Sequence, residues 1–223
     1  MTIRTRNIED GNVTAAKLGT GAVTAAKIDT GAVTAVKLST TLKTGFIELP
    51  LAAGRHIVTN DIGVIAVGGA GSTGSGGILG SDGAATYAKL TRENGATDKK
   101  FVITFPADAA NLPVAWDFVY PNDLDDTATV TVKFLARMAG ATDSPVVAVS
   151  YFESGFVGAY AADTNAGGNS AAVTGTSVAL YSVTITAANI TAAPGGASIE
   201  LVPATHTTNL MKVSAVWVEY TRA

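Results

Sequence analysis

The sequence contains no cysteine and only two histidines among its 223 residues, and this excludes several kinds of chemistry. Without cysteine there is no disulfide, no thiolate nucleophile and no cysteine-ligated zinc. His56 and His206 have no histidine or carboxylate nearby at a ligand spacing. We therefore interpret both as turn residues, not as metal ligands or catalytic bases.

Long apolar runs are also missing. The first ten residues, "MTIRTRNIED", lack the apolar core of a signal peptide, and no run approaches the ~20 residues that a membrane helix needs. This predicts a soluble protein with no membrane partner. Aromatic residues make up 7% and charged residues 15% of the chain, while short runs of Val, Thr and Ala recur throughout. This composition favours an all-β fold.

Charge is divided unevenly along the chain. Residues 1–45 contain six basic and three acidic residues, a net charge of +3, whereas the remainder carries a net charge of −6. A basic arm thus precedes an acidic body. The arm has about one lysine per ten residues and no aromatic side chain that would stack on a base, so we expect no nucleic-acid partner and favour an acidic protein surface.

The arm consists of decapeptide repeats, "GNVTAAKLGT", "GAVTAAKIDT" and "GAVTAVKLST", over residues 11–40. Their apolar residues lie five apart, which fits neither a helix face nor a strand face, so each unit must turn. One unit is too small to be stable alone, and its apolar columns need cover from other copies or other chains. A flexible linker of drifted duplications is the alternative. The candidate interface residues are Val13, Lys17, Leu18, Val23, Lys27, Ile28, Val33, Lys37 and Leu38.

Beyond residue 45 the chain reads as short strands separated by turn residues. Alternation is clearest at 128–134, 181–186 and 101–105. Such a series without long helical patterns predicts a jelly-roll-like β-sandwich over residues 46–223. Six weaker runs lie at 46–51, 86–90, 114–120, 146–152, 198–202 and 211–220.

The last run, 211–220, is apolar on both faces. Strict alternation places Met211, Val213 and Trp217 on one face and Val216, Val218 and Tyr220 on the other. One face would then pack in the core, and the second, with Val216, Val218 and Tyr220, would be a subunit interface. The alternative is a central strand buried within one subunit.

Two motifs invite a ligand and are interpreted as turns. "GAGSTG" at 69–74 matches a nucleotide-binding pattern, but the following "SGGILGSDG" cannot open the helix that would hold a phosphate. "PNDLDDTA" places Asp123, Asp125 and Asp126 together, without the glycine and distal glutamate of a calcium-binding EF-hand loop. We therefore predict no cofactor, no metal and no enzymatic activity.

Two phrases carry a resemblance to a known family. The stretch "PNDLDDTATVTVKFLARMAGATDSPVV" (121–147) and the ending "HTTNLMKVSAVWVEYTRA" (206–223) resemble tailed-bacteriophage virion proteins with a C-terminal jelly roll. The decapeptides resemble those at the bases of phage head-fibre and tail-fibre proteins.

The resemblance implies a homotrimeric structural protein on the capsid exterior, made in the host cytoplasm, that decorates and cements the shell. Its arm would anchor to the major capsid protein. The alternative is a tail-fibre tip that recognises a host glycan. A free carbohydrate-binding module would instead need exposed aromatic side chains, whereas Trp116 and Trp217 both lie in apolar strand patterns that predict core positions.

Overall fold

The computed structural model describes residues 43–56, 77–78, 88–93, 99–108, 113–155, 164–186, 190 and 195–223. All nine interface residues expected in the repeat arm, and the glycine-rich segment 69–74, lie outside this part of the chain. The chain divides into two units, residues 1–43 and 44–223, and every strand that the structure describes belongs to the second unit.

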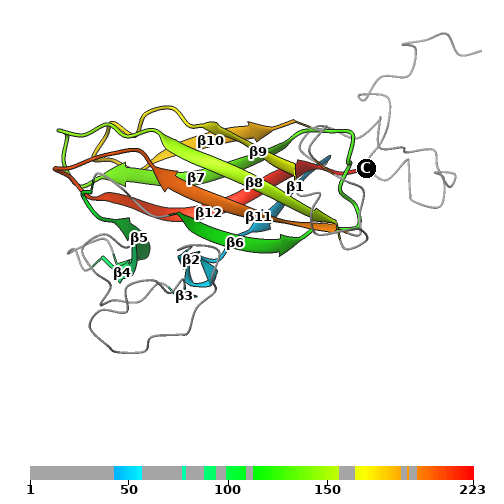
Figure 1. Ribbon diagram of the computed structural model, residues 1–223, viewed down its shortest axis with the longest axis horizontal. Helices are drawn as coiled ribbons and strands as arrows, with labels where there is room; N and C mark the ends of the chain where they lie inside the picture. Colours follow the sequence, from blue (N-terminus) through cyan, green and yellow to red (C-terminus); the bar gives the residue numbers. More distant parts are fainter. Residues whose placement is uncertain are drawn as a thin grey trace, which may run out of the picture. The chain divides into compact units, whose positions relative to one another are not determined.

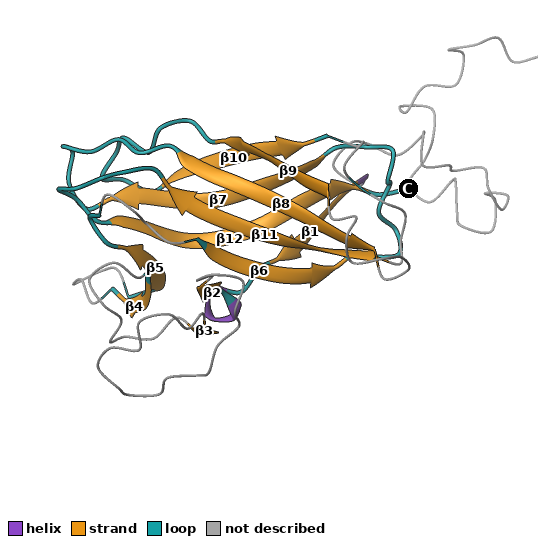
Figure 2. Ribbon diagram, in the orientation of Figure 1, coloured by secondary structure: helices purple, strands orange, loops and turns teal. Residues whose placement is uncertain are grey.

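This second unit consists of two six-stranded antiparallel sheets, and among the described residues helix is limited to short turns such as η4 (Leu51–Ala53) (Figure 2). Sheet A contains β1 (Thr44–Glu48), β4 (Lys89–Arg92), β5 (Phe101–Phe105), β7 (Val130–Met138), β10 (Ala179–Ile185) and β12 (Met211–Thr221). Sheet B contains β2 (Arg55–His56), β3 (Gly77–Ile78), β6 (Val114–Val119), β8 (Val147–Gly155), β9 (Thr164–Asn169) and β11 (Gly195–Pro203).

The chain passes repeatedly from one sheet to the other. Sheet A has the order β10-β7-β12-β5-β4, with β1 also paired to β12, and sheet B has the order β3-β2-β6-β11-β8-β9. From β5 to β12 every connection changes sheet except the one between β8 and β9, so the two sheets overlie each other (Figure 1). The predicted all-β, jelly-roll-like sandwich is confirmed.

Strict alternation along β7 and its neighbours builds the core. Val130, Val132, Phe134, Ala136 and Met138 are each at most 1% exposed, while the residues between them face outward. Branched and aromatic side chains at every second position of a pleated strand produce such a buried face. Facing residues from sheet B, among them the side chains of β8 and β11, complete one hydrophobic cluster.

Trp116 is part of this core, as predicted. Its side chain is 2% exposed, and its indole Nε1 donates a hydrogen bond to the carbonyl of Pro50 at 3.0 Å. The bond satisfies the one polar atom of a side chain that is otherwise buried for its apolar surface.

A β-bulge in β12 changes the prediction for the last strand. The pairing of β12 with β7 shifts between Val213 and Ala215, so the residues after it exchange faces. Val216, Val218 and Tyr220 are 2%, 1% and 6% exposed and belong to the core cluster of the subunit. The prediction that these three residues form a subunit interface is wrong, because their side chains pack inside the sandwich. Trp217, which strict alternation predicts in the core, lies between two of these inward-facing residues and points to the outer face.

Two substitutions at adjacent positions test which side chains of β12 face the core. Val218→Asp places an unpaired charge in the core and should lower the free energy of unfolding by several kcal/mol. Trp217→Asp should cost no more than about 1 kcal/mol, because its side chain is on the outer face. Thermal denaturation of both variants checks this, and an equally large loss of stability in the two would contradict the bulge.

Candidate functional site

The bulge gives sheet A an outer face with an unusual set of side chains. We call this surface the outer A face. It spans four neighbouring strands in the order β1, β12, β7 and β10 (Figure 1). Its members are Phe46, Glu48, Thr131, Lys133, Leu135, Leu180, Ser182, Thr184, Ala215, Trp217 and Glu219.

Trp217 lies in the middle row of the outer A face. It pairs directly with Glu48 on β1 and with Lys133 on β7. Lys133 also forms an ion pair with Glu219, two residues beyond the tryptophan on the same face of β12, and the two side chains are 24% and 31% exposed. An indole ring, an ammonium donor and a carboxylate acceptor are therefore neighbours on an accessible sheet surface.

Apolar and hydroxyl side chains surround this centre. Phe46 on β1 lies opposite Glu219 and is 71% exposed. Leu180 on β10 lies opposite Leu135 and is 54% exposed. Hydroxyl groups are added by Thr131, Ser182 and Thr184. The face thus combines apolar surface with a small number of polar groups, which is the composition of a surface that binds ligands or partners.

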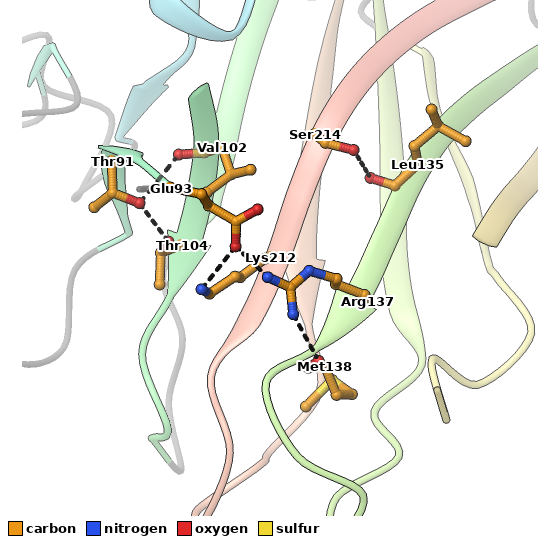
Figure 3. Close-up of polar contacts among 9 residues, drawn as sticks. All are labelled: Thr91, Glu93, Val102, Thr104, Leu135, Arg137, Met138, Lys212 and Ser214. Carbon is orange, nitrogen blue, oxygen red and sulfur yellow. Dashed lines mark hydrogen bonds and ion pairs between the residues drawn. The ribbon is translucent and has the colours of Figure 1, made fainter. Parts of the chain in front are cut away.

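A second polar cluster joins Glu93, the residue after β4, to Arg137 of β7 and Lys212 of β12 (Figure 3). The Glu93 carboxylate accepts hydrogen bonds from Arg137 and, at 2.8 Å, from Lys212. The side chain of Glu93 is only 7% exposed. Burial raises the pKa of Glu93, but the hydrogen bond from Lys212 and the charges of Lys212 and Arg137 outweigh it and hold the pKa below its ordinary value.

The aspartate motif "PNDLDDTA" has a structural role. The Asp123 carboxylate accepts a hydrogen bond from the Tyr220 hydroxyl at 3.0 Å and lies 3.4 Å from the Nε of Arg222. Asp125 accepts hydrogen bonds from the hydroxyl and the backbone N–H of Thr127 at 2.6 and 2.9 Å, which hold its pKa below the ordinary value. Within the described ranges, no group of three or more His, Asp or Glu residues is placed to hold a metal ion.

The loop fastens the end of β12. The backbone N–H of Asp125 donates to the carbonyl of Thr221 at 2.9 Å, and that of Ala223 donates to the carbonyl of Asp123 at 2.8 Å. The two segments that resemble phage proteins, 121–147 and 206–223, are therefore in contact, and hydrogen bonds join them.

His206 is buried between β11 and β12, where it forms an isolated β-bridge with Asp108, and it is not the turn residue that was predicted. Its side chain is 2% exposed, its Nδ1 lies 2.8 Å from the carbonyl of Ala204, and its backbone N–H donates to the carbonyl of Asp108 at 3.3 Å. The side chain of His56 lies outside the described part of the chain.

Sequence reasoning missed the outer A face because it assigned Trp217 to the core. The signal that remained was the alternation Lys133, Leu135, Arg137 on β7, whose outward side is charged and apolar in turn. Of the body residues predicted to form an interface, the structure brings Val216, Val218 and Tyr220 together, but on the opposite, inner side of the same strand.

No protein-family model matches the chain, and no curated protein does. Among solved structures, the chain is similar to the xylan-binding module CBM15, with 14% identity, a TM-score of 0.43, and coverage of 81% of this chain and 99% of that one. It is also similar to the CBM22-2 xylan-binding domain from Paenibacillus barcinonensis Xyn10C, with 13% identity, a TM-score of 0.41, and coverage of 60% and 86%.

A third similar structure is the enzymatically active domain of bacteriophage CBA120 tailspike protein 4, with 12% identity, a TM-score of 0.35, and coverage of 59% of this chain and 18% of that one. All three similarities concern the fold alone. In the described residues, no helix has the length and apolar character to span a membrane.

The Glu93 cluster predicts a pH-dependent contribution to stability. Glu93→Gln should lower the free energy of unfolding by about 1–2 kcal/mol at pH 7, because charged hydrogen bonds from Arg137 and Lys212 are lost. A lowered carboxyl pKa stabilises the fold above the ordinary pKa, and this stabilisation disappears as the pH falls through the folded-state pKa. The difference from wild type should therefore shrink in acid.

The matched control is Glu219→Gln, which removes the more exposed ion pair to Lys133 and should cost less than about 1 kcal/mol. Urea denaturation between pH 7 and pH 3 measures both variants. A loss for Glu93→Gln that is equal at all pH values would show that the cluster does not stabilise the ionised carboxylate.

Proposed function

We propose that the β-sandwich binds a glycan of a host-cell surface through the outer A face, as a non-enzymatic part of a bacteriophage virion. The observation that carries this proposal is the partly exposed position of Trp217 on the outer A face, beside the Lys133–Glu219 ion pair. An aromatic side chain at the surface is the feature that distinguishes glycan binding from other functions of such a sandwich. The bulge in β12 supplies it.

The chemistry of sugars fits this combination of side chains. A pyranose ring has an apolar face of C–H groups, which packs on an aromatic ring, and an edge of hydroxyl groups, which are both donors and acceptors. Trp217 supplies the ring, Lys133 supplies a donor and Glu219 supplies an acceptor. Charge-assisted hydrogen bonds of this kind orient a polar ligand strongly.

The virion context rests on the decapeptides and on the two phrases that resemble phage proteins. In this context the chain is a homotrimer on the virion surface, and the repeat arm attaches it to a structural protein of the particle. Capsid decoration is the second candidate function, with the major capsid protein as the partner. The repeated apolar columns favour it, since Val13, Val23 and Val33, and likewise Leu18, Ile28 and Leu38, recur in register and need cover from another chain.

The glycan-binding proposal predicts that Trp217→Ala weakens adsorption of the purified protein to host cells by tenfold or more, about 1.4 kcal/mol. Trp217→Phe should retain most of the binding, because it keeps an aromatic ring. Phe152→Ala is the matched control, since Phe152 is a partly buried aromatic residue on the outer face of sheet B. All three variants are first checked for an unchanged melting temperature. Equal binding by the Trp217→Ala and Phe152→Ala variants would contradict the proposal.

The arm is tested separately on undecorated capsids. Replacing Leu18, Ile28 and Leu38 by Ser should abolish attachment, because apolar burial contributes about 25 cal/mol per Å². Replacing Lys17, Lys27 and Lys37 by Gln should weaken it only slightly, because exposed ion pairs contribute roughly 0–1 kcal/mol each. Co-sedimentation with capsids over a salt series measures both triple variants. The reverse order would identify the arm as an electrostatic tether, and equal attachment of both variants and wild type would identify it as a linker.

A further inference from the structure

We infer that the outer A face selects a neutral glycan with adjacent free ring hydroxyls and discriminates against glycans built from acidic sugars. This inference rests on the proposed glycan-binding function and specifies the class of ligand. It comes from the charges that lie around Trp217, each of which has a defined place in the sheet.

Two carboxylates flank the tryptophan. Glu48 lies directly opposite Trp217 on β1, and Glu219 lies two residues further along β12 on the same face. Neighbouring strands are about 4.8 Å apart and alternate residues along a strand about 7 Å apart, so both carboxylates are within reach of one sugar unit packed on the indole ring.

The positive charge nearby is already compensated. Lys133 forms its ion pair with Glu219, and among the described residues no ion pair involves Glu48. The described residues next to Trp217 therefore carry a net negative charge. A carboxylate on a sugar bound there would face Glu48, and the strands described around it offer no unpaired cation to balance the two charges.

The other basic residues within β7 and β12, Arg137 and Lys212, do not change this. Arg137 lies four residues along β7 from Lys133, which corresponds to about 13 Å. Arg137 and Lys212 are both paired with the Glu93 carboxylate, and a distance of this size exceeds the screening length of about 8 Å at physiological salt. They offer no counter-charge to a ligand at Trp217.

The Lys133–Glu219 pair itself matches two adjacent hydroxyl groups. One hydroxyl donates to the carboxylate and its neighbour accepts from the ammonium group, so a diol replaces water around the pair without separating the charges. The hydroxyl side chains of Thr131 on β7 and Thr184 on β10 continue the same row from Glu219 across the sheet. They extend a polar track to neighbouring sugar units.

The test uses pairs of oligosaccharides that differ only at C6. Hexamers of β-1,4-mannan and β-1,4-mannuronan, and of β-1,4-glucan and β-1,4-glucuronan, are titrated into the full chain by calorimetry at pH 7 and low salt. In the pair that binds, we expect the neutral hexamer to bind at least tenfold more tightly than the acidic one.

Glu48→Gln should reduce this ratio about threefold or more by improving binding of the acidic hexamer. Glu219→Gln should weaken binding of the neutral hexamer, and Asp117→Asn, an exposed acidic position on sheet B, should change neither.

The outcomes separate the two proposals. If an acidic hexamer binds as tightly as its neutral partner or more tightly, and Trp217→Ala abolishes that binding, the outer A face is a glycan site and the inferred ligand class is wrong. If Trp217→Ala leaves the binding of every hexamer unchanged, the proposed function itself is contradicted.

Discussion

The β-bulge in β12 decides which side chains of this strand enter the core and which lie on the outer face of sheet A. It shifts the pairing with β7 between Val213 and Ala215, and a shift of one residue exchanges the two faces of a strand. Val216 and Val218 then fill the core, and Trp217 faces outward. Because β12 pairs with β1 and β7 on either side of Trp217, the side chains of these strands that lie beside Trp217 are on the same outer face of the sheet. The exposed Phe46 and the acidic Glu48 of β1 lie on this face.

Polar interactions at both ends of β12 hold the strand in this register, with Trp217 on the outer face. At its beginning, Lys212 shares the buried Glu93 carboxylate with Arg137 of the neighbouring strand. At its end, the Tyr220 hydroxyl donates to Asp123, while burial and this hydrogen bond raise the pKa of Tyr220. The tyrosine ring also covers Gly45 of β1, where a Cβ atom would lie 2.2 Å from the ring. The strand that carries Trp217 is thus fastened along its length before any ligand binds, which favours specific recognition.

Alternation in the sequence predicted most of the sandwich, because β5, β7 and β10 have apolar residues at every second position. Strand β9, "TNAGGN", has no such pattern and was missed; its place at the edge of sheet B comes from pairing with β8, and a Cβ at Gly167 would lie 2.5 Å from the Val149 carbonyl. The bulge in β12 could not be predicted from the sequence for a different reason. Both faces of 211–220 carry apolar side chains, so either phase satisfied the pattern, and the candidate site depended on the phase.

Glycan binding on the outer A face requires that Trp217 is accessible to a ligand while Trp116 is buried in the core. Fluorine NMR of the protein labelled with 5-fluorotryptophan tests this directly, because the chain has two tryptophans and Trp217→Phe assigns their signals. We expect the Trp217 signal to respond to exchange of H2O for D2O and to shift when host-surface polysaccharide is added, while the Trp116 signal does neither. A Trp217 signal as protected from solvent as that of Trp116, or unchanged by the polysaccharide, would contradict glycan binding on this face.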